Sequence, residues 1–148
     1  MVRAPRHRHC FHWRLMGDGA NVRSMTSARL FFTLGSVLAG LAVGIGAFGA
    51  HGLRATLSAE DLATFEVGVR YQMYHALGLF AVAWAGSQWN SATVTMAGWM
   101  FVAGIVLFSG SLYLYVLNGP RWLVFVTPVG GVAFIVGWTL LAWGALRG

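Results

Sequence analysis

The sequence contains no lysine, only four acidic residues and a single cysteine. Charged residues make up 9% of it, against about 25% in typical soluble domains. This scarcity excludes an ordinary soluble domain, and the lone Cys10 cannot form an internal disulfide. The 50 residues 71–120 include no Asp, Glu, Lys or Arg. Since a soluble domain cannot keep so long a stretch away from water, the sequence indicates an integral membrane protein.

Four apolar segments are long enough to cross a bilayer as helices. A hydrocarbon core about 30 Å thick needs about 20 apolar residues per helix. We expect spans at residues 30–50, 71–87, 93–117 and 122–146. Because only helices satisfy their own backbone hydrogen bonds in lipid, the predicted fold is all-α, an integral membrane four-helix bundle formed by residues 25–148. Pro128 is expected to kink the fourth span or to mark its effective start.

The one well-charged loop, residues 54–70, separates the first two spans. Ser58 followed by Asp61 resembles a capping box, which predicts a helix start. Glu66 and Arg70 stand four residues apart and are expected to form an ion pair on one helix face. We expect a short amphipathic helix that lies on the membrane surface and runs into the second span.

The first 24 residues carry five of the ten arginines and lack the apolar run of a secretory signal. Three interpretations stay open: a start assigned upstream of a true start at Met25, a basic cytoplasmic extension, or a mitochondrial targeting peptide. We expect residues 1–24 to be a poorly ordered basic extension. The net charge of +6 does not indicate nucleic-acid binding, because the other arginines stand singly at predicted helix ends. The excess of arginine on one side of the membrane places both termini on the cytoplasmic side only if this extension is present.

Glycine is abundant, with 20 residues, and it recurs at helical spacing. Small residues stand four apart on the first span and seven apart on the fourth: Ser36, Gly40 and Gly44, then Gly130, Gly137 and Gly144. Apolar surface gives no driving force between helices in lipid, so helices associate through small residues that allow close backbone contact. We expect these six positions to be helix-packing contacts within the bundle, and a homo-oligomer through the first span stays an alternative.

Ionisable and polar residues gather where the first span ends and the second begins. The candidate functional cluster is His51, Glu66, Arg70, Tyr71, Gln72 and His75, with both histidines expected at the same membrane face. Near-membrane ionisable groups are functional candidates. The favoured interpretation is nevertheless structural, with both histidines bonded to loop carbonyls. A small-solute or proton pathway through His51, Glu66, Tyr71 and His75 is an alternative, and a haem or metal site at His51 and His75 is another.

No nucleophile–base pattern or phosphate-binding loop is visible, so we expect no enzyme activity. No cofactor or bound metal is expected, because two histidines alone do not complete a metal site. We expect a structural or interaction role in the inner (plasma) membrane. The expected partners are the lipid bilayer and either a second copy or another membrane protein.

Two stretches resemble a known family. GAFGAHGL at residues 46–53, and Phe65 followed by Tyr71, Gln72, Tyr74 and His75, are similar to the small four-helix membrane proteins of the YgdD/YwdK type, grouped as domain of unknown function 423. The similarity extends from about Met25 to Gly148. It implies a multipass membrane protein and carries no biochemical activity with it.

Overall fold

The computed structural model describes the backbone of residues 10–89 and 91–147, and the side chains of residues 25–89 and 91–147. These described residues contain helices and no strand. The elements, in chain order, are α1 (Cys10–Phe48), the π-helical turn η1 (Gly49–Leu53), α2 (Ala59–Gln88), α3 (Ala92–Gly104), the π-helical turn η2 (Ile105–Ser109), α4 (Gly110–Val116) and α5 (Leu123–Arg147).

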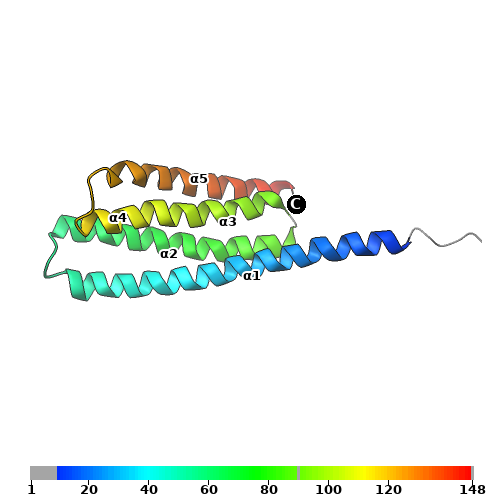
Figure 1. Cartoon of the computed structure of the whole chain (residues 1–148), viewed down its shortest axis with the longest axis horizontal. Helices are drawn as coiled ribbons and strands as arrows, with labels where there is room; N and C mark the ends of the chain where they lie inside the picture. The colour runs from blue at the N-terminus through cyan, green and yellow to red at the C-terminus, as the bar shows by residue number, and fades with distance from the viewer. Residues whose placement is uncertain (1–9, 90, 148) are drawn as a thin grey trace, which may run out of the picture.

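Four antiparallel rods make up the bundle, as Figure 1 shows. The first is α1 with η1, the second is α2, and the fourth is α5. The third is one continuous rod because α3, η2 and α4 follow one another without a break. Along their length, α1 packs against α2, α2 against the third rod, and the third rod against α5. The N-terminal part of α1 extends beyond the other rods.

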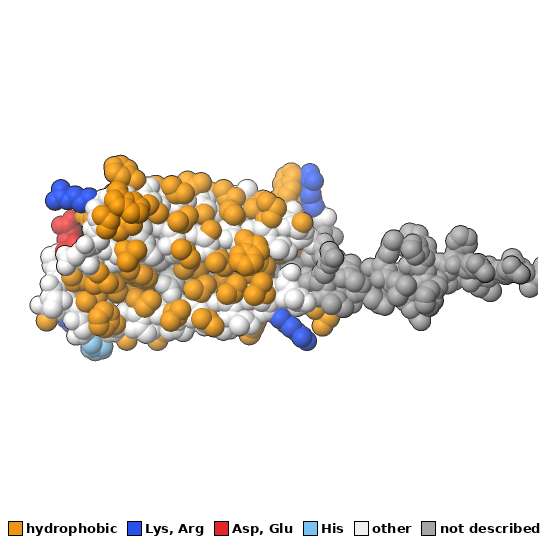
Figure 2. Space-filling view, viewed as in Figure 1, with side chains coloured by type: hydrophobic (Ala, Val, Ile, Leu, Met, Phe, Trp, Pro, Cys, Tyr) orange, Lys and Arg blue, Asp and Glu red, His pale blue; other side chains and the backbone are white. Residues whose placement is uncertain are grey.

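Among the described residues, three helices are long and apolar enough to cross a membrane: Met25–Leu53, Ala92–Val116 and Leu123–Arg147. The remaining rod, α2, has 30 residues but begins with charged residues. Figure 2 shows hydrophobic side chains over the middle of the bundle and charged side chains at its two ends. An apolar band between two polar ends is the surface that a bilayer requires.

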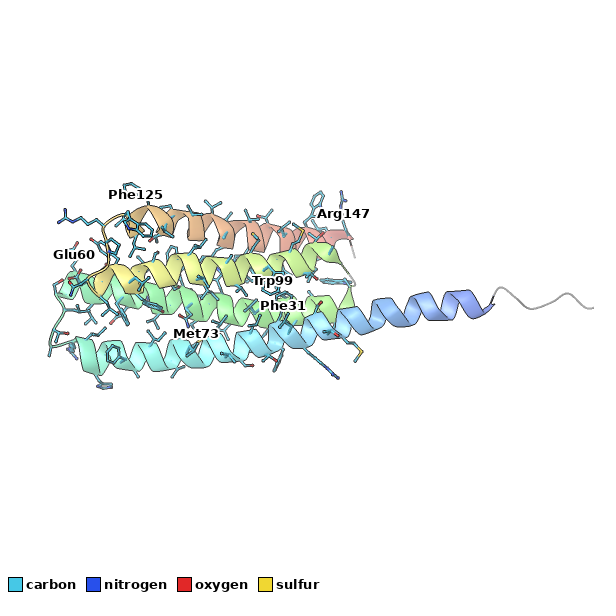
Figure 3. The ribbon with its side chains drawn as sticks, viewed as in Figure 1. Phe31, Glu60, Met73, Trp99, Phe125 and Arg147 are labelled. Atoms are coloured by element: carbon cyan, nitrogen blue, oxygen red, sulfur yellow. The ribbon has the colours of Figure 1, made fainter. Side chains whose placement is uncertain are left out.

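The core is built from aromatic and small side chains on all four rods. Phe31, Leu79, Phe101 and Phe134 are each at most 3% exposed and belong to one cluster. Phe31 also meets Trp99 edge to face, with ring centroids 5.7 Å apart, and Figure 3 shows these two side chains between α1 and α3. A smaller cluster of Leu53, Phe65 and Val116 closes the opposite end. Both ends of the bundle therefore have packed interiors.

The glycines of α5 confirm the packing prediction for that helix. A Cβ at Gly137 would lie 2.6 Å from Phe101, and one at Gly144 would lie 2.8 Å from Val94. A Cβ at Gly130 would overlap the backbone nitrogen of Phe108. A Cβ at any of these positions would collide with the third rod, with a side chain at Gly137 and Gly144 and with the backbone at Gly130, so the glycines allow α5 to pack closely on it.

The prediction for α1 was wrong for contacts within the bundle. Ser36, Gly40 and Gly44 are exposed, and a Cβ at Gly40 or Gly44 would meet nothing within 4 Å. The inward face is offset by about one residue: a Cβ at Gly35 would lie 2.9 Å from the Ala76 carbonyl oxygen. The predicted pattern thus lies on the outer face of α1, because other residues of this helix face α2.

The expected amphipathic helix runs into the second span without a break. Residues 59–88 form one helix, and Ser58 caps its start by accepting a hydrogen bond from the Asp61 amide at 3.1 Å. Nothing breaks the helix between Arg70 and Tyr71. Phe65 is 2% exposed because it packs in the small end cluster, which holds the first turns of α2 in line with the bundle.

The backbone of residues 10–24 continues α1 as a helix, and the expectation of a poorly ordered extension stays a prediction. The expectation for residues 1–9 lies outside the described residues.

At the turn between α4 and α5, Asn118 adopts a left-handed conformation with φ of 69°, and the Gly119 amide donates to the Leu114 carbonyl at 2.7 Å.

Candidate functional site: a buried polar network between the helices

Gln72 connects three rods. Its Nε2 donates to the Leu38 carbonyl of α1 at 2.9 Å, and its Oε1 accepts from the Tyr113 hydroxyl of α4 at 3.0 Å. Gln72 is 4% exposed, so these bonds replace the water that the amide would have in solution. Gln72 therefore makes an interhelical hydrogen bond from each end of its side-chain amide.

The two partners of the Gln72 side-chain amide determine its orientation. A carbonyl oxygen only accepts, so the nitrogen of the Gln72 amide must face Leu38. The amide oxygen then faces α4, where it needs a donor, and the Tyr113 hydroxyl supplies one. The Tyr113 ring is held by Phe65 at 5.0 Å between centroids and lies against Gly68, where a Cβ would be 2.8 Å from it.

His75 lies one turn further along α2 and is 5% exposed. Its Nδ1 lies 2.8 Å from the Tyr71 carbonyl, so Nδ1 carries a proton. The imidazole stacks on Phe134, with centroids 3.4 Å apart and planes 8° apart. Phe101 and Trp138 lie at 5.5 and 6.2 Å from it. The site is thus an aromatic box around the imidazole.

The third rod contributes two serines on either side of Gly110. The Ser111 hydroxyl lies 2.7 Å from the Thr127 hydroxyl of α5 and donates to the Phe108 carbonyl at 2.9 Å. Ser109 is 0% exposed, and its hydroxyl has no partner among the described residues. Ser109 ends η2, where the Gly110 amide bonds to the Ile105 carbonyl, five residues back. Such π-turns are rare and often found at functional sites.

The charged members of the predicted cluster lie elsewhere. His51, Glu66 and Arg70 are exposed at the end of the bundle. Arg70 bonds through Nε to the Glu66 carbonyl at 3.4 Å, so the expected ion pair between these two side chains was wrong. Tyr71 is 40% exposed, and its ring stacks on Phe108 at 4.6 Å. Of the six predicted residues, only Gln72 and His75 are buried.

The two histidines lie far apart along the bundle. Along the α1–α2 contact, a Cβ at Gly49 would lie 2.9 Å from Phe65, and Leu38 bonds to Gln72. His51 is therefore opposite about residue 63, some 12 residues from His75, which is about 18 Å at 1.5 Å per residue. Within the described residues, no group of three His, Cys, Asp or Glu side chains could hold a metal. The prediction that brought these histidines together was wrong.

Sequence reasoning missed Tyr113 and Thr127. Both are polar residues within apolar spans, where each is expected to seek a partner on another helix. A polar residue in an apolar span was the available signal. It does not identify the hydrogen-bond partner, because the partner depends on the register of the rods. The network as built bonds α1, α2, α4 and α5 to one another, and its chemistry is that of interhelical adhesion.

An all-helical bundle with an apolar band and buried interhelical hydrogen bonds defines a multipass type of membrane protein. The chain belongs to the family described as "Protein of unknown function (DUF423)", whose model matches residues 45–131. It is 48% identical over 120 residues to the UPF0382 membrane protein YwdK of Bacillus subtilis, covering 80% of this chain and 98% of that one.

Other relatives give the same description. A UPF0382 membrane protein of Haemophilus influenzae is 38% identical over 118 residues, covering 79% of this chain and 94% of that one. A relative from Staphylococcus saprophyticus is 48% identical over 119 residues, covering 80% of this chain and 98% of that one. No solved structure matches the chain. The chain is a membrane protein of a family with no assigned molecular function.

Proposed function

We propose that the protein is a four-span bundle of the inner (plasma) membrane with a structural or interaction role. The observation that carries this proposal is how the polar side chains between the rods are used. The buried Gln72 and Ser111 bond to the half-buried Tyr113 and Thr127, helix to helix. They stabilise one arrangement of the rods rather than forming a substrate site.

In this proposal α2 crosses the membrane in addition to the three long apolar helices. Its 30 residues span about 45 Å at 1.5 Å per residue, which exceeds a hydrocarbon core of about 30 Å. The apolar half can cross the core while residues 59–70 project into the headgroup region. Both termini then lie on one side, with the turn at residues 89–91, and the loops at 54–58 and 117–122 lie on the other.

Cysteine labelling tests the span count. In a Cys10→Ser background, Ser87→Cys and Thr56→Cys should react with a membrane-impermeant maleimide from opposite sides of sealed vesicles. Thr56→Cys and Asn118→Cys should react from the same side. Labelling of Ser87→Cys and Thr56→Cys from one side would contradict four spans.

The surface offered to a partner is the charged end of α2. Glu60, Glu66 and Arg70 are exposed there, and no ion pair joins them in the part of the chain that the structure describes. Charged side chains at an interface rim govern specificity and association rate. A second membrane protein with a complementary rim, or a second copy, would meet this end.

Crosslinking in cells tests the interaction. The Glu66→Arg variant should lose the crosslinked species that the wild type forms, because the charge at the rim is reversed. Arg147→Glu, at the opposite end, is the matched control and should keep that species. Identical crosslinked species for wild type and Glu66→Arg would count against the proposed role.

We propose no catalytic reaction. The Ser111 hydroxyl is used by Phe108 and Thr127, and the Ser109 hydroxyl has no histidine or carboxylate within hydrogen-bond reach among the described residues. A nucleophile needs a neighbouring base to be activated. Hydrolase and transferase screens with the purified protein should therefore give no turnover above a detergent blank.

A proton pathway is the second candidate, and the buried Ser109 hydroxyl favours it. Ser109 in η2 and His75 in α2 are two buried polar groups on neighbouring rods, and they are not bonded to each other. Proteoliposomes carrying an internal pH dye would show proton flux in the wild type and none in Ser109→Ala. Equal flux with and without the protein would reject this candidate.

A further inference from the structure

An open groove lies between α1 and α2 at the end of the bundle opposite Glu60. Its volume is about 380 Å³, within the range of about 300–1,000 Å³ that ligand pockets occupy. The large side chains Phe32, Phe80 and Trp84 line it. Small residues between them, Ala28 and Ala83, give the groove its depth.

The groove changes from polar to apolar along its length. Arg29 and Ser87 line its outer end, at the start of the apolar part of α1 and the end of α2. One turn further into the bundle, Phe32 and Phe80 meet with ring centroids 4.9 Å apart and close the inner end. A ligand that fits this groove must be apolar along its body and polar at its head.

The positive charge at the outer end of the groove determines which polar headgroup a ligand can have. Arg29 is exposed, and the acidic side chains that the structure describes, Glu60, Asp61 and Glu66, all belong to the first turns of α2. Figure 3 shows Glu60 at one end of the bundle and Arg147 at the other. A guanidinium with no described carboxylate nearby complements an anion, and its planar fork suits a phosphate.

We propose that this groove binds an anionic phospholipid, with the phosphate on Arg29 and an acyl chain along Phe32, Phe80 and Trp84. The proposal rests on the membrane location and not on the interaction role proposed above, which concerns the opposite end of α2. A second copy is a poorer occupant, because an isologous contact at this groove would bring two Arg29 side chains together without a carboxylate.

The other arginine at this end supplies a control. The Arg147 guanidinium lies 4.3 Å from the centroid of the Trp143 ring, and neither residue lines the groove. Arg29 and Arg147 are both exposed and carry the same charge. A general attraction to an anionic surface would involve both, whereas a lipid seated in the groove involves Arg29 alone.

Native mass spectrometry of the full chain in mild detergent tests the proposal, with phosphatidylglycerol and phosphatidylcholine as probes. The wild type should retain one phosphatidylglycerol in preference to phosphatidylcholine. Arg29→Gln should weaken phosphatidylglycerol retention about fivefold, as expected for loss of one arginine near an anionic headgroup. Arg147→Gln should leave it unchanged.

A second variant addresses the apolar part of the groove. Ala28→Phe fills the space beside Phe32 and should lower retention of phosphatidylglycerol while Arg29 is still present. Equal losses for Arg29→Gln and Arg147→Gln would overturn the proposal in favour of general surface charge. Equal retention of the two lipids, or a dimer mass that Ala28→Phe abolishes, would overturn it in favour of apolar contact or of a second copy.

Discussion

The side-chain amide of Gln72 donates to the main-chain carbonyl of Leu38, 34 residues earlier in the chain, at 2.9 Å. This bond joins α2 to α1 near the middle of both rods. A helix carbonyl has a second lone pair, so Leu38 can accept it without losing its own helical bond. Gln72 therefore adds a directional bond to the packing that sets the register of the first two rods.

Replacement of Gln72 by leucine should lower the free energy of unfolding by about 1–3 kcal/mol. Leucine keeps the volume but leaves the half-buried Tyr113 hydroxyl without its acceptor, and an unsatisfied polar group away from water costs about that much. Thermal unfolding in mild detergent measures the effect.

A double-mutant cycle with Tyr113→Phe serves as the control for Gln72. Interhelical hydrogen bonds in membranes average about 0.6 kcal/mol, so the two substitutions should be non-additive by about that amount or more. Tyr74→Phe, at a tyrosine 56% exposed, should show no coupling. Strict additivity of Gln72→Leu and Tyr113→Phe would contradict the connection.

Alanine should have opposite effects at Gly137 and Gly40. At Gly137 the new Cβ would lie 2.6 Å from Phe101, and overpacking of this kind costs about 1–3 kcal/mol. At Gly40 it meets nothing within 4 Å, and alanine is the better helix former by up to about 1 kcal/mol. Unfolding midpoints in detergent should fall for Gly137→Ala and hold or rise for Gly40→Ala. Changes of the same sign at both positions would be inconsistent with the packing described.

The aromatic box predicts a graded response at His75. His75→Ala removes the ring stacked on Phe134 and should cost at least about 2 kcal/mol through the cavity it leaves. His75→Phe keeps a stacked ring and loses only the bond to the Tyr71 carbonyl, so it should cost less. His51→Ala, at an exposed position, should stay within about 0.5 kcal/mol of wild type. Unfolding curves for the three variants would reveal a different order if His75 served mainly as a hydrogen-bond donor.

The turn after α4 can be tested at Asn118, whose φ is 69°. A left-handed conformation costs roughly 1–2 kcal/mol for residues with a Cβ and no compensating polar group. Asn118→Ala should therefore lower stability by about 1 kcal/mol, whereas Asn118→Gly should be neutral or stabilising. A matched drop for both variants would mean that the Asn118 side chain, and not its backbone, is what the turn requires.

The positions of the helices could be predicted because charge is a local property of the chain. The lack of charged residues between Arg70 and Arg121 marks two apolar helices whatever surrounds them. The Ser58 cap was equally visible, since its partner Asp61 is three residues away. The glycine spacing on α5 also reports its packing face, because that face is occupied along its length.

The site was less predictable because it depends on register. Whether His51 lies beside His75 is decided by how far α1 and α2 slide past each other, and neither helix alone records this. The continuity of α2 past Arg70 depends on Phe65 packing in the end cluster. The outward position of Gly40 follows from which side of α1 meets Gln72. Tertiary contacts fixed each of these outcomes after local preference had fixed the helices.

The π-turn η2 gives the third rod one residue more than a regular helix would need over the same rise, because the Gly110 amide bonds five residues back. Deletion of one residue from 105–109 would restore ordinary α-helical winding. Because the π-turn absorbs the extra residue locally, the rest of α4 would keep its faces, with Tyr113 toward Gln72 and Ser111 toward Thr127. Conversion of the turn to α-helical winding with every residue kept would instead turn α4 by about 100° about the helix axis. The π-turn thus lets this span hold a surplus residue while both of its halves keep their partners.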